Sequence, residues 1–324
     1  MNKMRFDDLH DVVRDKAVKL APVDLIQDIK RYGYMPSNGQ ETLTPFQRED
    51  GTAVGRVLNM TDHALRQLCS RIGVPYEFMG KCPQGLRLRT INHFIQNGEL
   101  RERYMLRTTE GNNVRAIMSE RFTPFDDSDL FDAIETQCKG ATVETYEFGK
   151  TSTHLRLTFP ETETEMKKGD VVKTGLHITN SEVGLRSVTV HALVYRLVCT
   201  NGLIAPDGNG KYGSRHIGKF DTIKEGVRSA IEEAKYSTEA LTHRFRESMR
   251  LEIENPIDEM EQIAKDNKLT QERFKEMLNA YTNEPDPTVY GVTNAITRSA
   301  QKFEAEARYS MERLATNYLS KNVH

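Results

Sequence analysis

The sequence predicts an α+β protein, in which a body with a mostly antiparallel sheet and helices on one side is followed by long C-terminal helices. Strand-like segments joined by tight-turn residues predict hairpins at residues 42–58 and 104–118. No regular alternation of strands and helices is visible, although a doubly wound parallel sheet would require one. After residue 221 the apolar residues follow helical spacing. We therefore expect the 324 residues to form one large domain with an appendage, or two domains.

The first part, residues 1–60, is expected to hold a helix and a hairpin. Apolar residues from Leu9 to Ile29 recur at helical spacing. Thr42–Arg48 and Ala53–Leu58 then flank Asp50-Gly51, a pair that suits a tight turn between antiparallel strands. The first strands should therefore precede the next helix.

The second part, residues 61–220, is expected to be the α+β body. Thr61 or Asp62 caps one predicted helix and Ser128 caps a later one. Between them, Tyr104–Thr108 and Val114–Met118 form the second hairpin. Further strands are expected at residues 141–148, 153–159, 171–178 and 186–199.

The predicted strand at residues 153–159 carries two kinds of side chain in alternation. Leu155 and Leu157 fall on one side, whereas His154 and Arg156 fall on the other. We expect the first side to be packed and the second to meet water or a ligand.

The third part, residues 221–324, is acidic and is expected to be helical. Its two long amphipathic stripes are Val227, Ile231, Ala234, Thr238, Leu241, Phe245 and Met249, and Ile296, Ala300, Phe303, Ala307, Met311, Leu314 and Tyr318. Two shorter helices are expected between them, at residues 257–281. The stripes predict two long helices packed on each other or on the body, and the alternative is contact with another copy of the chain.

The composition argues against a membrane protein and against several enzyme classes. Hydrophobic residues make up 37% and charged residues 28%, and no apolar run is long enough to span a bilayer. Residues 1–16 lack the pattern of a secretory signal, so we expect a cytoplasmic protein. The four cysteines lack the CxxC spacing of a zinc site, and no phosphate loop, Rossmann glycine pattern, HExxH or GxSxG motif is present. We expect no cofactor, and the sequence contains no recognisable catalytic motif.

Acidic residues and histidines offer one alternative, a metal-dependent nuclease. Its candidate ligands are Asp126, Asp127 and Asp129 together with His154, His177 and His191. The aspartates stand where a helix should begin, however, and carboxylates there satisfy free N–H groups. Capping is therefore the preferred interpretation, and no metal site is predicted.

The charges are distributed unevenly although the formal net charge is only −2. Residues 61–122 and 171–220 are basic, and the following region is acidic. The cations on or beside the predicted strands are candidates for contacts with DNA phosphates. These candidates are Arg107, Arg115, Arg156, Arg186, Arg196, Arg215 and Lys219. We expect about half of them to pair with acids inside the fold.

Five short motifs in order suggest a family. They are Arg107–Gly111, Ala116–Phe125, Gly175–Gly184, Leu197–Leu203 and Ser214–Gly218. This order resembles the phage- and plasmid-associated family catalogued as domain of unknown function nine hundred thirty-two. The resemblance covers roughly residues 103–219 and fades through the helices. It implies an origin on a mobile element, and it supplies no catalytic residue or cofactor.

The leading hypothesis is a phage or plasmid protein that binds DNA, preferably single-stranded, through its phosphate backbone. Such a protein would assist recombination or replication, for example by annealing strands as a homo-oligomer. The alternatives are the metal-dependent nuclease and a protein-binding inhibitor of a host defence system that uses the acidic helices. Retention of DNA supports the first, cleavage supports the second, and inertness toward DNA supports the third.

Overall fold

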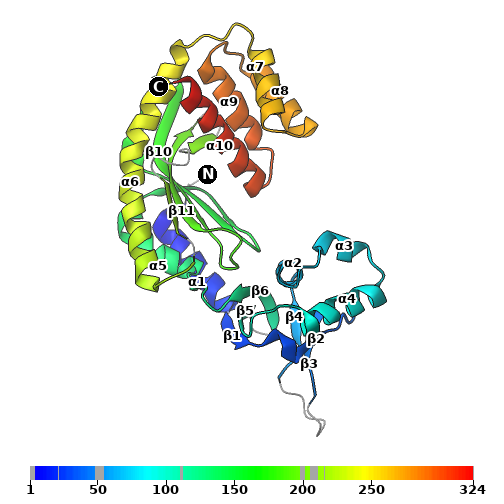
Figure 1. Ribbon diagram of the computed structural model, residues 1–324. Coiled ribbons are helices and arrows are strands. Elements are labelled where there is room, and N and C mark those ends of the chain that lie inside the picture. The colour runs from blue at the N-terminus through cyan, green and yellow to red at the C-terminus, as the bar shows by residue number, and fades with distance from the viewer. Residues whose placement is uncertain are drawn as a thin grey trace.

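The computed structural model describes residues 4–20, 22–47, 55–109, 112–197, 201–204, 211–214 and 216–323. These residues form two lobes, each with its own hydrophobic core (Figure 1). The small lobe comprises residues 23–119, and the large lobe comprises residues 4–20 and 125–323. The cores therefore do not follow the expected boundaries at residues 60 and 220. The expected turn at Asp50-Gly51 lies outside the described residues.

The small lobe is a six-stranded sheet with three helices. Its strands are β1 (Val23–Gln27), β2 (Tyr32–Tyr34), β3 (Glu41–Pro45), β4 (Leu58–Met60), β5 (Tyr104–Thr109) and β6 (Asn113–Ser119), in the order β1-β5-β6-β4-β3-β2. All neighbours are antiparallel except β4 and β6. The helices are α2 (Asp62–Arg71), α3 (Tyr76–Lys81) and α4 (Gln84–Asn97), and η1 (Ile29–Arg31) is a short 3-10 helix. The second predicted hairpin is confirmed by the pairing of β5 with β6.

The large lobe contains a second, antiparallel sheet. Its strands are β7 (Thr142–Phe148), β8 (Thr153–Thr158), β9 (Thr164–Lys167), β10 (Asp170–Asn180), β11 (Val188–Arg196), β12 (Asn201–Ile204) and β13 (Lys211–Ser214). The order β12-β11-β10-β8-β7 forms its main path, and β13 and β9 pair with β11 and β10. The 3-10 helix η2 (Pro160–Thr162) follows β8. The predicted mostly antiparallel sheet is therefore confirmed.

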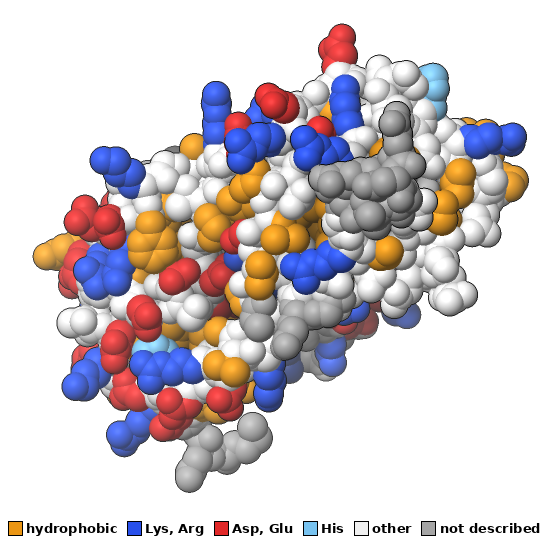
Figure 2. Space-filling model, turned by 90° about the horizontal axis from the view of Figure 1, so that it is seen from below, with side chains coloured by type: hydrophobic (Ala, Val, Ile, Leu, Met, Phe, Trp, Pro, Cys, Tyr) orange, Lys and Arg blue, Asp and Glu red, His pale blue; other side chains and the backbone are white. Residues whose placement is uncertain are grey.

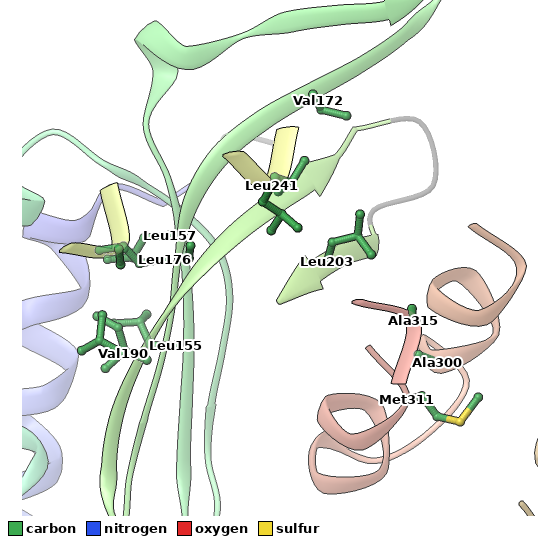
Figure 3. Close-up of a cluster of buried hydrophobic side chains, with 14 of the residues drawn as sticks. Leu155, Leu157, Val172, Leu176, Val190, Leu203, Leu241, Ala300, Met311 and Ala315 are labelled. Carbon is green, nitrogen blue, oxygen red and sulfur yellow. The ribbon is translucent and has the colours of Figure 1, made fainter. Parts of the chain in front are cut away.

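Three helices cover one face of this sheet. They are α1 (Phe6–Leu20), α5 (Asp127–Cys138) and α6 (Phe220–Glu247). Leu155, Leu157, Leu176 and Val190 point from the strands into the core on this side, to which Leu241 of α6 also belongs (Figure 3). Burial of such side chains stabilises the lobe by about 1.5–3 kcal/mol each.

The remaining helices form a bundle at the other end of the chain. They are η3 (Ser248–Arg250), α7 (Pro256–Asp266), α8 (Gln271–Asn283), α9 (Val289–Ala300) and α10 (Ala305–Asn322). Helix α10 turns back along α9 and lies on the sheet face opposite α6 (Figure 1). None of the helices among the described residues has the length and apolar character needed to cross a bilayer.

Three details differ from the sequence-based expectations. The first helix ends at Leu20, and residues 23–27 form an edge strand. The last amphipathic stripe is split between α9 and α10. The packing of α10 against α9 outweighs the helical propensity of residues 301–304, so the chain turns there. Helices also lie on both faces of the large sheet, since α10 covers the face that was expected to stay open.

Candidate nucleic-acid interface

The polar face of the large sheet is buried beneath α10. His177 lies opposite Arg156 of β8 and His191 of β11 in the strand register. His154 Nδ1 is 3.3 Å from His177 Nε2, and the Tyr309 hydroxyl of α10 is 3.1 Å from His191 Nε2. All three histidines are at most 5% exposed. This polar layer is therefore an interior layer, and a DNA strand has no access to it.

The arginine of this layer has a dedicated partner. Arg156 donates from Nη2 to Glu312 Oε2 at 2.5 Å, and both side chains are buried. Burial raises the pKa of Glu312, and the charge of Arg156 opposes this shift. Arg156 was a candidate for phosphate binding, and that expectation is corrected because its charge is matched by Glu312 away from water.

Burial also keeps two histidines of this layer, His154 and His177, neutral. It lowers the pKa of His154 to about 4, and repulsion from Arg186 and Arg156 acts in the same direction. Glu306 lies 3.1 Å from His154 Nε2 but is itself paired with Arg186. Burial also lowers the pKa of His177 well below its usual value.

The predicted aspartates do not join these histidines. The backbone N–H of Asp126 donates to the Asp129 carboxylate at 2.8 Å, so Asp126 rather than Ser128 stands at the start of α5. Asp127 is buried and accepts hydrogen bonds from Lys16, Thr153 and Asn180. Within the described ranges, no histidine, cysteine, aspartate and glutamate side chains are grouped so that they could hold a metal ion. The geometry therefore favours the capping interpretation over the metal ligands.

Two further candidates connect the lobes instead of facing solvent. Arg107 of β5 is 1% exposed and donates to Asp24 of β1, to both oxygens of Asp126, and to the backbone oxygen of Glu182. Burial by itself lowers the pKa of Arg107. The hydrogen bonds and negative charges of the two aspartates have a larger combined effect, so the pKa of Arg107 is raised. Arg115 donates to the Glu182 carboxylate at 2.6 Å. Both arginines hold the lobes together, so their expected role on an open DNA-binding face is corrected.

Three of the four remaining candidates lie in different surroundings. Arg196 is buried and bound to Asp170 and Glu284, so its guanidinium is not accessible to a DNA phosphate either. Lys219 is exposed at the start of α6. Arg215 lies outside the residues that the structure describes. The expected alignment of several of these cations along one open sheet face is therefore not found in the part of the chain that the structure describes, and the view from below shows acidic and basic side chains interspersed (Figure 2).

Among the described candidates, Arg186 lines two pockets of several hundred Å³, whereas Arg115 lines a much smaller one of about 10 Å³. The larger pocket at Arg186, which we call the arginine pocket, has a volume of about 390 Å³ between the α7–α8 turn, α8, α10 and the β10–β11 loop. Its lining includes Arg186, Arg273 and Arg313, with Glu306 as the single acidic residue. The lining therefore carries three positive charges and one negative charge.

One aromatic ring lies close to two of these guanidinium groups. Arg186 lies 5.3 Å and Arg313 lies 5.6 Å from the centre of the Tyr309 ring. Burial lowers the pKa of Arg186, and the nearby charge of Arg313 lowers it further. Two like charges beside one ring favour an anion near them, and Glu306 already pairs with Arg186.

A second pocket shares Arg186 with the first. This pocket, which we call the lobe pocket, has a volume of about 350 Å³ and is lined by both lobes and by the segment at residues 216–217. Met118, Phe122, Leu185 and Ile217 supply apolar walls. The two pockets therefore meet at a single side chain.

Sequence reasoning missed Arg273 and Arg313. Both stand in the region that the sequence marked as acidic, next to Glu272 and Glu312. Only the packing of α8 beside α10 brings them to Arg186. Helical spacing in the sequence could not predict that the three arginines lie close together, because they come from two separate helices and a loop.

Together the fold and the pockets define a two-lobed α+β protein with an arginine-lined cavity. Residues 115–320 match the family described as Domain of unknown function (DUF932), and the chain belongs to that family. The match extends through the C-terminal helices, so the expected fading after residue 219 is wrong. All three pocket arginines lie inside the matched span. No curated protein and no solved structure matches the chain.

Proposed function

We propose that the protein binds single-stranded DNA through its phosphate backbone, as a cytoplasmic protein of phage or plasmid DNA metabolism. The observation that carries this proposal is the arginine pocket, where Arg186, Arg273 and Arg313 face one cavity with a single acid. Binding of this kind assists recombination or replication, for example during strand annealing.

Guanidinium groups suit this ligand better than other cations do. Each guanidinium presents several N–H donors in a planar fork that matches two phosphate oxygens. Tyr309 adds an aromatic ring close to both Arg186 and Arg313. The net charge of the chain is only −2, so attraction of a polyanion depends on this local cluster.

The proposal places the DNA on different residues from those expected at first. Arg107, Arg156 and Arg196 are each at most 3% exposed and hold carboxylates within the fold. A buried guanidinium cannot reach a phosphate without breaking these ion pairs. The contacts are therefore assigned to Arg186, Arg273 and Arg313.

Binding titrations at several salt concentrations test the proposal. The probe is a labelled single-stranded oligonucleotide, and the variants are Arg273→Ala and Arg313→Ala, with Arg250→Ala as the control. Arg250 is an exposed arginine on η3 that pairs with nearby Glu247 and does not line the pocket. Each lost phosphate contact should reduce the log–log salt slope by about 0.7.

The control should keep the slope of the parent protein. No retention of DNA by the parent, or equal slopes for all folded variants, would contradict the proposal. Annealing in a closed ring also requires a homo-oligomer, and light scattering in solution tests this part by measuring the mass of the assembly.

A further inference from the structure

The arginine pocket and the lobe pocket are joined but differ in chemistry. Arg186 lines both of them. On one side of it lie Arg273 and Arg313, and on the other side lie the apolar side chains of Leu185 and Ile217. Leu185 is 50% exposed and Ile217 is 57% exposed, so this apolar surface is open to a ligand. A ligand that fills both pockets needs an anionic group next to an apolar one.

The walls of the lobe pocket favour a flat group. Phe122 and His216 stack with ring centres 5.0 Å apart and ring planes 17° apart. Met118 of β6 adds a polarizable thioether to the same pocket. Apolar walls with a few polar groups are typical of pockets that bind small planar ligands.

His216 leaves hydrogen-bonding capacity in this wall. Its side chain is buried, and apart from an interaction with the backbone of Thr123 its ring nitrogens have no hydrogen-bond partner among the described residues. Burial lowers its pKa to about 4, so the ring is neutral and offers one donor and one acceptor. A buried polar atom without a partner is unfavourable, and a hydrogen-bonding ligand edge would relieve this.

We propose that the two pockets bind one nucleotide unit of a single strand, with its phosphate in the arginine pocket and its base in the lobe pocket. This inference rests on the proposed function and adds the form of the substrate. A base can enter the lobe pocket only when it is unpaired and unstacked, as in single-stranded nucleic acid. The strand therefore passes across Arg186, between the two lobes.

Oligonucleotides with and without bases test this inference. The probes are an oligothymidylate, an abasic strand with the same number of phosphates, and a duplex of the oligothymidylate with its complement. Stacking of one base should make the parent bind the oligothymidylate roughly tenfold more tightly than the abasic strand. The duplex should bind more weakly than the oligothymidylate.

A matched pair of variants locates the base. Ile217→Asn changes the lobe pocket, whereas Ile257→Asn changes a similarly exposed isoleucine on α7 that lines neither pocket. Neither substitution alters the charge. Ile217→Asn should bring the affinity ratio of the two strands close to one, and Ile257→Asn should keep it. Leu185→Asn provides a second variant in the lobe pocket, with the same expected loss.

The outcomes separate this inference from the proposed function. If the parent binds no strand, both fail. If it binds the abasic strand and the oligothymidylate equally, phosphate binding stands and the base pocket is wrong. A base preference that survives in folded Ile217→Asn and Leu185→Asn also overturns the inference. Thymidine monophosphate that competes as well as the oligothymidylate would overturn the assignment to a strand.

Discussion

Helix α10 separates two regions in which arginine side chains have opposite surroundings. On its sheet side, Arg156 is 3% exposed and bound to Glu312. On its pocket side, Arg313 shares a cavity with Arg273 and Arg186. The first guanidinium is removed from water and matched by a carboxylate, whereas the other three outnumber the acid beside them. The position of an arginine on a predicted strand therefore does not indicate whether it binds DNA. Its exposure to solvent and the carboxylates beside it determine whether its charge can bind a phosphate.

The largest expected effect is on the sheet side of α10. Arg156→Ala removes the partner of Glu312, which is fully buried. An uncompensated buried carboxylate should lower the free energy of unfolding by about 3–5 kcal/mol. Urea denaturation of the parent and the variant measures this loss.

The double variant Arg156→Met with Glu312→Leu is the control. It removes both charges and keeps most of the volume, so it should be far more stable than Arg156→Ala. Equal stability of the single and double variants would show that the lost packing, and not the unpaired charge, causes the effect.

Acid should weaken the same layer. The folded protein holds the pKa of His154 at about 4, whereas the unfolded chain protonates near 6.5. Between these values the unfolded state binds more protons, so stability falls as the pH falls. From pH 6.5 to pH 5 the free energy of unfolding should drop by about 1.5 kcal/mol through His154 alone.

Urea titrations across this range, with His154→Gln, check the effect. The variant has no imidazole at this position, so its stability should depend less steeply on pH. His216 lies in the lobe pocket with its pKa also lowered to about 4, and it should contribute a similar slope of its own. An unchanged slope in His154→Gln would refute the assignment to the polar layer.

Where the lobes meet, a glycine allows a matched comparison. Gly184 has a φ of +72°, and a Cβ atom there would lie 2.1 Å from Cε of Met118. Gly73 has nearly the same φ, +71°, but a Cβ atom there would meet nothing within 4 Å. Gly73→Ala should cost about 1 kcal/mol through its backbone alone. Gly184→Ala should cost about 2 kcal/mol in thermal or urea denaturation, because Met118 must also move, and equal losses would show that the contact is relieved freely.

The smallest expected effect is on the pocket side of α10. Arg273 is only partly buried, and a substitution there leaves no buried carboxylate without its partner. Arg273→Ala should change the free energy of unfolding by less than about 0.5 kcal/mol. A loss as large as that of Arg156→Ala would mean that the pocket arginines are structural, and the contrast between the two sides of α10 would disappear.

The local patterns of the sequence predicted much of the architecture. Alternation in residues 153–159 correctly separated Leu155 and Leu157 from His154 and Arg156, because strand geometry fixes the side on which each residue lies. The same pattern could not show that α10 covers the polar side. Coverage depends on residues about 150 positions further along the chain, such as Glu306, which contacts His154.

Helix ends and the candidate site were harder to predict. The stripe from Ile296 to Tyr318 continues through residues 301–304, and neither glycine nor proline marks the turn there. Tertiary packing makes this break, so propensity could not reveal it. The arginine pocket was missed for the same reason, since Arg186 and Arg273 meet only through the packing of a loop against helices.

The path of the chain has a consequence for synthesis. Helix α1 belongs to the large lobe, where Phe6 stacks on Phe131 of α5, yet the whole small lobe lies between them in the sequence. A ribosome adds about 5–20 residues per second, so α1 waits for several seconds before α5 emerges. During that interval the small lobe, whose core spans residues 29–117, can complete its own packing. The apolar side of α1 is therefore covered by its partner helix only after α5 has emerged.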